Sequence, residues 1–161
     1  MNNPAVWTWD YVLPRTRIRL LADRVRSRRF GAVWRLAVDI INPSLSVQRL
    51  QHELWELTVR YTITFTVQEL NPPFDFAFLD AVRIWEWDCH DHDAVTGWLR
   101  IENFCPMTTS INRTKIVRVT DDMLDTELGG DEVRAQIHLR NTTISGLPIE
   151  RFTPILHLLP N

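Results

Sequence analysis

The sequence predicts an α+β fold, with a mainly antiparallel sheet, two or three helices packed on one face, and a basic N-terminal helix. Several stretches alternate apolar and polar residues, which is typical of strands with one buried face. Other stretches repeat apolar residues at helical spacing. The composition, 45% hydrophobic and 24% charged over 161 residues, is that of a globular protein of one domain.

The N-terminal region predicts an arm followed by a basic helix. Residues 1–14 are expected to form an extended aromatic arm, ahead of a single α+β domain over 15–161. Pro14 suits the first position of a helix, and Gly31 suits its end. Between them, apolar residues recur at helical spacing with arginines on the other faces: Ile18, Leu21, Ala22 and Val25. We therefore expect a helix at about 15–29.

The next stretch predicts a strand, a helix and a second strand. Apolar residues alternate from Trp34 to Ile40, and an Asn-Pro-Ser break follows. Helical spacing then predicts a second helix at about 45–56, from these residues: Val47, Leu50, Leu54 and Leu57. The clearest alternation covers 58–68 and predicts a strand. Because this alternation extends back to Trp55, the border between helix and strand is soft.

The middle of the chain fits two periodicities. Phe74, Phe76 and Phe78 alternate, but Phe78 also lies at helical spacing from Val82 and Trp85. We expect a short helix at about 75–82 and a strand at about 83–88.

The C-terminal half predicts further strands. They are expected at 97–104, 113–119 and 132–140, with an acidic turn or short helix from Asp121 to Leu128. The tail at 152–159 is apolar, and we expect it to pack on its own sheet or on a neighbouring subunit.

The charge of the chain is strongly segregated. Lys115 is the single lysine among 18 basic residues, so the other 17 are arginine. Residues 1–35 hold eight arginines against two acids, a net charge of +6. The remaining 126 residues hold 18 acids against 10 bases, a net charge of −8, so the total of −2 conceals two regions of opposite sign.

The arginines of the predicted first helix indicate an anion-binding surface, because a guanidinium pairs with phosphate or carboxylate through a planar fork. The partner is nucleic acid, an anionic membrane surface or the acidic face of a neighbouring subunit. Aromatic residues upstream are positioned to stack on bases: Trp7, Trp9 and Tyr11. The ordinary alternative is a solvated helix face. The arginines concerned are Arg15, Arg17, Arg19, Arg24, Arg26, Arg28 and Arg29.

The segment Asp88-Cys89-His90-Asp91-His92-Asp93 is the candidate metal site. Alternate residues of a strand point to one side, so His90, His92 and Asp88 are positioned to bind one divalent ion. A catalytic zinc site needs a third ligand, which His52, His138 or a carboxylate would have to supply from a distance. The alternative is an exposed acidic loop, in which carboxylates favour charged histidines.

These patterns favour a non-enzymatic function. No phosphate-binding glycine loop, nucleophile elbow or Cys-x-x-Cys pair is present. We expect a self-associating structural or assembly protein, a homo-oligomer of the kind found in virus and phage particles. Its arginine-rich helix would contact nucleic acid or a neighbouring subunit. The alternatives are a small nucleic-acid-binding accessory protein and a metal-dependent enzyme centred on His90 and His92.

The sequence carries no recognised targeting or membrane segment. No signal-peptide pattern opens it, and no apolar run approaches the roughly 18 residues of a membrane span. We therefore expect an intracellular or virion-associated protein that has no transmembrane segment. The only cofactor we consider is the divalent metal at His90 and His92.

Overall fold

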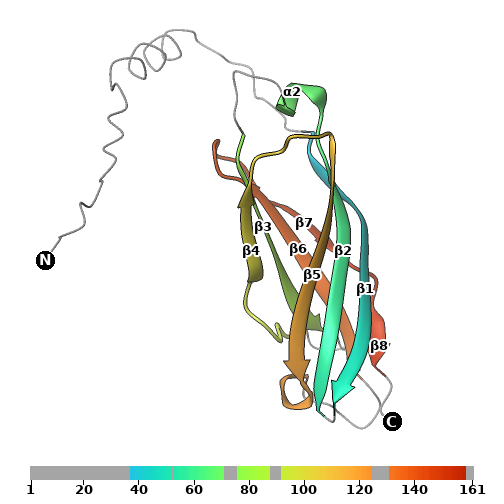
Figure 1. The fold of residues 1–161 in the computed structure, drawn as a ribbon. Helices are drawn as coiled ribbons and strands as arrows, with labels where there is room; N and C mark the ends of the chain where they lie inside the picture. Colours follow the sequence, from blue (N-terminus) through green and yellow to red (C-terminus); the bar gives the residue numbers. More distant parts are fainter. Residues whose placement is uncertain (1–36, 52, 71–75, 88–91, 125–130, 159–161) are drawn as a thin grey trace, which may run out of the picture. The chain divides into compact units, whose positions relative to one another are not determined.

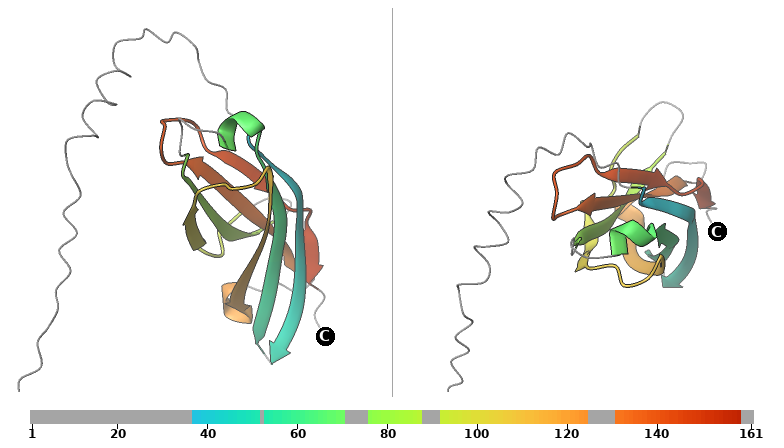
Figure 2. Two further views of the ribbon diagram at one scale, coloured as in Figure 1. Left: turned by 45° about the horizontal axis from the view of Figure 1, so that its top comes forward. Right: turned by 90° about the horizontal axis from the view of Figure 1, so that it is seen from above.

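A computed structural model describes residues 37–51, 53–70, 76–87, 92–124 and 131–158. The chain divides by its internal contacts into two units, Met1–Arg35 and Leu36–Asn161. The first unit lies outside the described residues, and so does the helix expected at 15–29. The second unit contains two antiparallel β-sheets facing each other (Figures 1 and 2).

The first sheet has three strands and the second has five. In the first, the order is β1 (Asp39–Gln51), β2 (Leu54–Thr64) and β5 (Ser110–Thr120). In the second, β4 (Leu99–Phe104), β3 (Phe78–Glu86) and β6 (Asp131–Asn141) are neighbours. The last two strands both pair with β6: β7 (Ile149–Phe152) and β8 (Leu156–Leu158). Two short helices lie outside the sheets: α2 (Val67–Leu70) and the 3₁₀ helix η1 (Asp121–Met123).

This strand order defines an immunoglobulin-like β-sandwich. The neighbours β1, β2 and β5 correspond to strands A, B and E of that architecture, and β3, β6 and β7 correspond to C, F and G. Strand β4, the fourth along the chain, pairs with β3 and therefore belongs to the second sheet. Because unrelated proteins share this architecture, the fold alone assigns no function.

Inward-facing residues of both sheets form one hydrophobic core. Strand β2 contributes Leu57, Val59 and Ile63, all at 0% exposure, and β6 contributes Val133, Ala135 and Ile137 at the same value. Three phenylalanines close the core near α2. The ring centroids of Phe65 and Phe78 are 5.1 Å apart, and those of Phe78 and Phe104 are 5.9 Å apart.

The predicted α+β class is wrong, because strands occupy the positions of the helices expected at 45–56 and 75–82. Residues 45–51 belong to β1, and β2 begins at Leu54. Leu45 and Val47 are half-buried, whereas Ser44 and Ser46 are exposed, so the true period is two. A short apolar run satisfies both periods, and pairing with β2 along ten residue pairs decides between them.

The helix expected at 75–82 is wrong for the same reason: a short apolar run fits both a helix and a strand. Strand β3 begins at Phe78, and Phe78, Val82 and Ile84 all face the core at 0% exposure. Asp80 lies among them at 0%. An apolar residue every second position is the pattern of a strand, and pairing with β6 fixes it.

Most of the predicted strands are confirmed. The alternation over 58–68 corresponds to β2 up to Thr64, although Val67 lies on α2 and is 64% exposed. The strands expected at 97–104, 113–119 and 132–140 correspond to β4, β5 and β6. The apolar tail packs on its own sheet, through β7 and β8.

A buried carboxylate holds the first described residues against α2. Glu69, 5% exposed, accepts hydrogen bonds from the backbone nitrogens of Ala37 and Val38 at 2.8 and 3.1 Å. Its other oxygen accepts from the Thr66 nitrogen at 2.7 Å, and the Glu69 nitrogen donates to the Thr66 hydroxyl at 3.4 Å. This reciprocal pair is a capping box at the N-terminus of α2. The Glu69 carboxylate therefore both caps α2 and holds Ala37 and Val38 at the start of the described chain.

Among the described residues, no helix has the length and apolarity needed to cross a membrane.

The core predicts a large stability difference between two substitutions. Phe78→Ala removes a buried ring that contacts two other phenylalanines, and we expect it to cost about 3–5 kcal/mol of unfolding free energy. Val67→Ala, at an exposed position, is the control and should change stability by less than about 0.5 kcal/mol. Urea denaturation of the full chain measures both, and equal effects would contradict the assignment of the core.

Candidate functional site

A fully buried carboxylate, Asp80 on β3, lies between the two sheets among apolar side chains. Burying an unpaired carboxylate costs several kcal/mol, so its partners decide whether this position is tolerated. Three of them come from the facing sheet: Tyr61 on β2, and Arg113 and Lys115 on β5. We call Asp80, these three residues and Glu102 of β4 the inter-sheet charge cluster.

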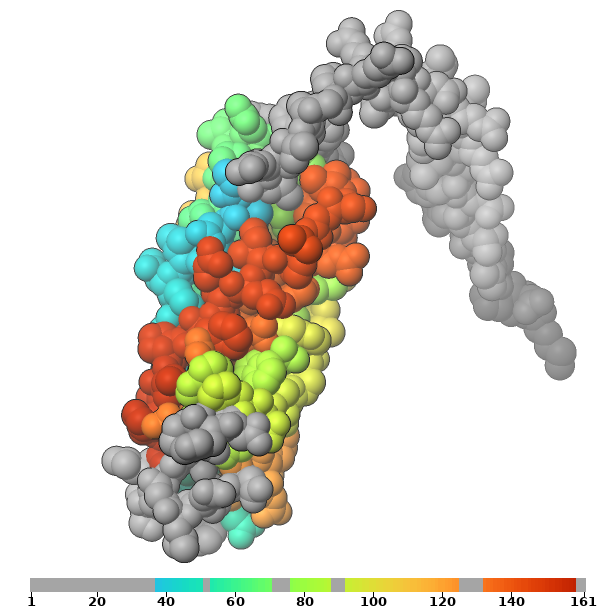
Figure 3. All heavy atoms as spheres, turned by 180° about the vertical axis from the view of Figure 1, so that it is seen from behind, coloured from blue at the N-terminus to red at the C-terminus, as the bar shows by residue number. Residues whose placement is uncertain are grey.

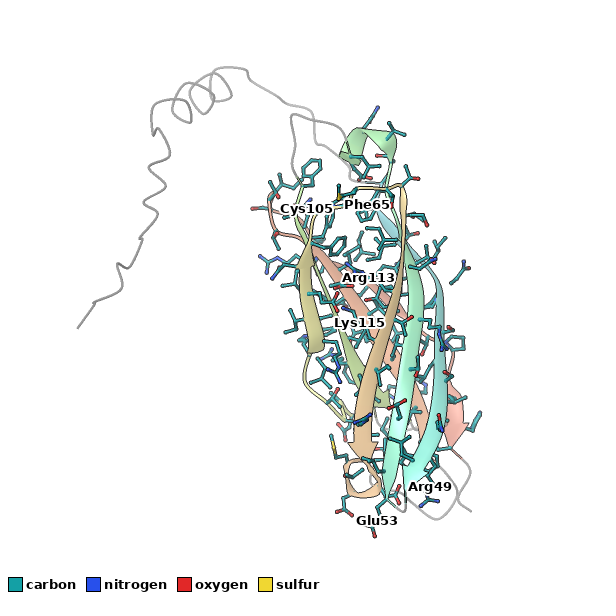
Figure 4. All side chains as sticks on the ribbon, viewed as in Figure 1. Arg49, Glu53, Phe65, Cys105, Arg113 and Lys115 are labelled. Carbon is teal, nitrogen blue, oxygen red and sulfur yellow. The ribbon has the colours of Figure 1, made fainter. Side chains whose placement is uncertain are left out.

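Lys115 connects most of the cluster. Its Nζ lies 3.1 Å from Asp80 Oδ1, 2.8 Å from Glu102 Oε1 and 2.9 Å from the carbonyl oxygen of Arg100, to which it donates. The Lys115 side chain is 2% exposed. Figure 4 shows Lys115 and Arg113 on β5 between the two sheets.

A β-bulge in β4 directs the Arg100 carbonyl toward the cluster. The pairs Asp80 with Glu102 and Val82 with Leu99 leave one extra residue on β4. Arg100 has a φ of 52°, a left-handed conformation that non-glycine residues rarely adopt. Its side chain donates through Nε to the Ile116 carbonyl oxygen at 2.6 Å, so Arg100 links β4 to β5 at both its carbonyl and its guanidinium.

Arg113 and Tyr61 contact the second oxygen of Asp80. The Tyr61 hydroxyl donates to Oδ2 at 2.8 Å, and Arg113 Nε forms an ion pair with the same oxygen at 3.2 Å. The Arg113 guanidinium also lies 4.3 Å from the centre of the Phe104 ring and 3.3 Å from Glu102 Oε2. Both Asp80 oxygens therefore face positive charge or a hydroxyl donor.

The cluster shifts the pKa values of two of its own residues, Tyr61 and Glu102. Burial raises the pKa of Tyr61 above its ordinary value, and the Asp80 charge raises it further. The phenol therefore stays protonated as a donor. The hydrogen bond from Lys115 lowers the pKa of Glu102, while partial burial opposes it. Glu102 is half-exposed, at 51%, so it is where the cluster meets solvent.

A second group of polar and aromatic side chains covers the outer face of the second sheet, and we call it the arginine–tryptophan ladder. The Arg83 guanidinium lies 4.3 Å from the Trp85 ring centre and 4.6 Å from that of Trp98. Arg83 Nε and Trp85 Nε1 both donate to Gln136 Oε1, at 2.6 and 2.8 Å. Gln136 in turn donates to Glu150 at 2.9 Å.

The ladder continues toward the end of β3. Arg134 lies between Trp87 and Phe152, 4.3 and 4.1 Å from their ring centres, and burial lowers its pKa. The His92 ring stacks on Trp87 with centroids 3.6 Å apart and 9° between planes. Figure 3 shows this side of the molecule, where residues of β3 lie beside those of the C-terminal strands. The stacked guanidiniums already cover these rings, so the ladder stabilises the face.

Most residues of the predicted sites lie outside the described residues. These are the arginines from Arg15 to Arg29, the stacking residues Trp7, Trp9 and Tyr11, and Asp88 and His90 of the metal site. Among the described residues, His92 stacks on Trp87, and no group of three or more His, Cys, Asp or Glu is placed to hold a metal ion. The predicted anion site and metal site both stay predictions.

The sequence analysis missed the inter-sheet charge cluster. Its signal was present: Lys115 is the one lysine of the chain, and it lies in the alternation of β5 at an inward position. Asp80 likewise occupies an inward position of β3. A charged residue in the apolar register of a strand marks a buried ion pair, but the partner is visible only after the sheets are assembled.

Comparisons with known proteins add little. No family model matches the chain, and no curated protein matches it. One similar solved structure is described as the "Crystal Structure of the Putative ApaA Protein from Bordetella pertussis". It shares 15% sequence identity with this chain, covers 77% of this chain and 92% of its own, and has a TM-score of 0.36. A TM-score of this size supports no inference about fold or function.

The cluster predicts a strong asymmetry between single and double substitutions. Lys115→Met leaves Asp80 with less compensation in the core and should cost about 3–5 kcal/mol. Adding Asp80→Leu removes the stranded carboxylate, so the double variant should recover part of that loss. Urea denaturation measures both, and a double variant less stable than Lys115→Met would contradict a charge-paired core.

The ladder predicts that Arg83 stabilises the sheet mainly through its planar guanidinium. Arg83→Lys keeps the charge but loses stacking on two tryptophans, and should cost about 1–2 kcal/mol. Arg140→Lys, at an exposed position of β6, is the matched control, with a change of less than about 0.5 kcal/mol. Thermal unfolding monitored by tryptophan fluorescence compares them. Equal stability of the two variants would mean that the ladder contributes nothing.

Proposed function

We propose that this chain is a non-enzymatic assembly protein whose copies join head to tail, the basic N-terminal segment of one copy contacting the acidic end of the next. The observation that carries the proposal is the separation of charge along the second unit. Acidic residues gather at the end away from α2, which we call the acidic end. Its described acids are Glu53, Glu86, Asp93, Asp121, Asp122 and Glu132.

Strand pairing places these acids together. Glu53 follows the turn between β1 and β2, and its carbonyl oxygen accepts a hydrogen bond from the Asp121 nitrogen at 3.1 Å. Glu86 ends β3, and its nitrogen donates to the Asp93 carbonyl oxygen at 2.9 Å. Glu132 lies beside this point, at the start of β6.

Acids outnumber cations among the described residues at this end. Arg49 pairs with Asp121 at 3.2 Å, and Arg134 lies between two aromatic rings. The acidic end is therefore a net negative surface.

The basic segment joins the sandwich at the opposite end. Ala37, the first described residue, is bound by Glu69 of α2, whereas Glu53 lies at the other end of β1 (Figure 4). The 13 residues of β1 span about 40 Å at the rise of a β-strand. A chain with +6 in residues 1–35 and net negative charge at one end of the sandwich carries the two opposite charges that a contact between copies needs. A heterologous contact of this kind generates rings or filaments.

The arginines expected to form the contact are Arg15, Arg17, Arg19, Arg24, Arg26, Arg28 and Arg29. Arginine binds carboxylates through two parallel hydrogen bonds, and exposed pairs of this kind weaken as salt screens them. The same arginines suit phosphate, so nucleic acid is the competing partner. The virus-particle setting suggested by the sequence stays a prediction.

Salt-dependent mass tests the proposal. Light scattering on a sizing column should show an oligomer of the full chain at low salt that dissociates near 1 M salt. The ultraviolet absorbance ratio of the oligomer should be that of protein without nucleic acid. A species that carries nucleic acid at low salt, and has the same number of copies after losing it, would instead identify a nucleic-acid-binding protein.

Two pairs of variants identify the surface involved. Glu53→Gln with Asp122→Asn removes two charges from the acidic end and should shift the dissociation to lower salt. Gln68→Lys with Ser145→Lys changes the net charge equally, but on α2 and in the loop after β6, and should leave the salt dependence unchanged. Equal shifts for the two pairs would show that only net charge matters and would contradict a specific acidic docking end.

A further inference from the structure

The single lysine of the chain occupies a position that charge pairing alone does not explain. A chain with 17 arginines places its one primary side-chain amine in the most buried charged cluster, against the fully buried Asp80. Arginine is generally the better residue for buried ion pairs, and Arg113, two residues earlier, already pairs with the same carboxylate. What lysine adds is a nucleophilic amine.

We propose that Lys115 and Asp80 condense to an intramolecular amide that joins β5 to β3 and so links the two sheets covalently. The Nζ–Cγ bond forms, the Cγ–Oδ1 bond breaks, and one water molecule leaves. The ammonium and carboxylate supply all the atoms of the amide and of the water, so no oxidant, reductant or added reagent is needed.

The positions of Nζ and Asp80 suit this reaction. Nζ lies 3.1 Å from Oδ1, so the amine is held beside the carboxyl group whose Cγ it attacks. Fixing two groups in this way gives effective concentrations up to about 10⁵–10⁸ M, which favours condensation in a site that excludes water. Lys115 is 2% exposed and Asp80 is 0% exposed, and Phe78 of the core lies on β3 two residues before Asp80.

The other members of the cluster, Tyr61, Arg113 and Glu102, lie close to the atoms that react. Attack on Cγ places negative charge on Oδ2, and the Tyr61 hydroxyl and Arg113 Nε already contact that oxygen at 2.8 and 3.2 Å. Donors aimed at such an oxygen stabilise the tetrahedral intermediate. Glu102 Oε1, 2.8 Å from Nζ, accepts in turn the two protons that the ammonium loses and passes both to the leaving Oδ1, which departs as water.

The product keeps the hydrogen bonds of the cluster. The amide carbonyl, formed from Oδ2, accepts from the Tyr61 hydroxyl with the Arg113 guanidinium close by, and the amide N–H donates to Glu102 or to the Arg100 carbonyl oxygen. Condensation also replaces a buried ion pair, whose desolvation is costly, with a neutral group. Arg113 and Glu102 remain as an ion pair at the edge of the cluster.

Two measurements on the full chain test the proposal. Intact-mass spectrometry should give a mass below that of the sequence by one water, about 18 Da, as expected for a covalent modification of this kind. A protease that cleaves only after lysine has one possible site here. It should leave the denatured wild-type chain uncut, because the amide hides Lys115, and should cut the chain in which the amide has not formed.

Substitutions test which residues take part in the condensation. Lys115→Arg should have the mass of its sequence. Glu102→Gln should keep a cleavable Lys115 and condense about 10²–10⁴-fold more slowly, the usual contribution of a general base. Glu150→Gln, on the outer face, is the control and should condense like the wild type. A wild-type chain of full mass that is cut after Lys115 would overturn the proposal, as would a chain that has lost water elsewhere and is still cut there.

Discussion

The structure depends on one constraint: a carboxylate, Asp80, is buried between two sheets and must be compensated from the facing sheet. Tyr61, Arg113 and Lys115 of the first sheet meet both of its oxygens. Hydrophobic burial holds the sheets together without direction. The inter-sheet charge cluster adds direction, because a shift of β5 by one residue would turn Lys115 outward and leave Asp80 unpaired. The cluster therefore fixes the register of the two sheets relative to each other.

Features around the cluster follow from this constraint. The left-handed Arg100 and its bulge supply a carbonyl acceptor for Lys115, and the bulge offsets β4 against β3. Strained backbone of this kind persists only where the surroundings determine it strongly. Toward the ends of the sandwich the chemistry differs: the Glu69 cap holds the chain at α2, and acidic residues gather at the far ends of β3 and β5. A rigid body with distinct ends is what a head-to-tail assembly unit requires.

The sequence predicted the strands whose alternation was long, and failed where the apolar run was short. Val133, Ala135, Ile137 and Leu139 alternate without interruption, so β6 was predicted nearly to its bounds. Val47, Leu50, Leu54 and Leu57 also fit a helix, and the antiparallel pairing of β1 with β2 excludes it. The lone lysine and the charge segregation were visible in the sequence. That Lys115 meets Asp80, 35 residues away, was not, because contacts between sheets leave no local periodicity.

The environment of Lys115 tests the account most directly. Labelling with ¹⁵N at the side-chain nitrogen of lysine gives one NMR signal, because the chain has one lysine. The account predicts a slowly exchanging nitrogen whose protons contact Asp80 and the Glu102 methylenes, and the chemical shift distinguishes an amide from an ammonium ion. A rapidly exchanging signal at the position of a solvent-exposed lysine would contradict the buried inter-sheet cluster, and with it the account of how the two sheets are joined.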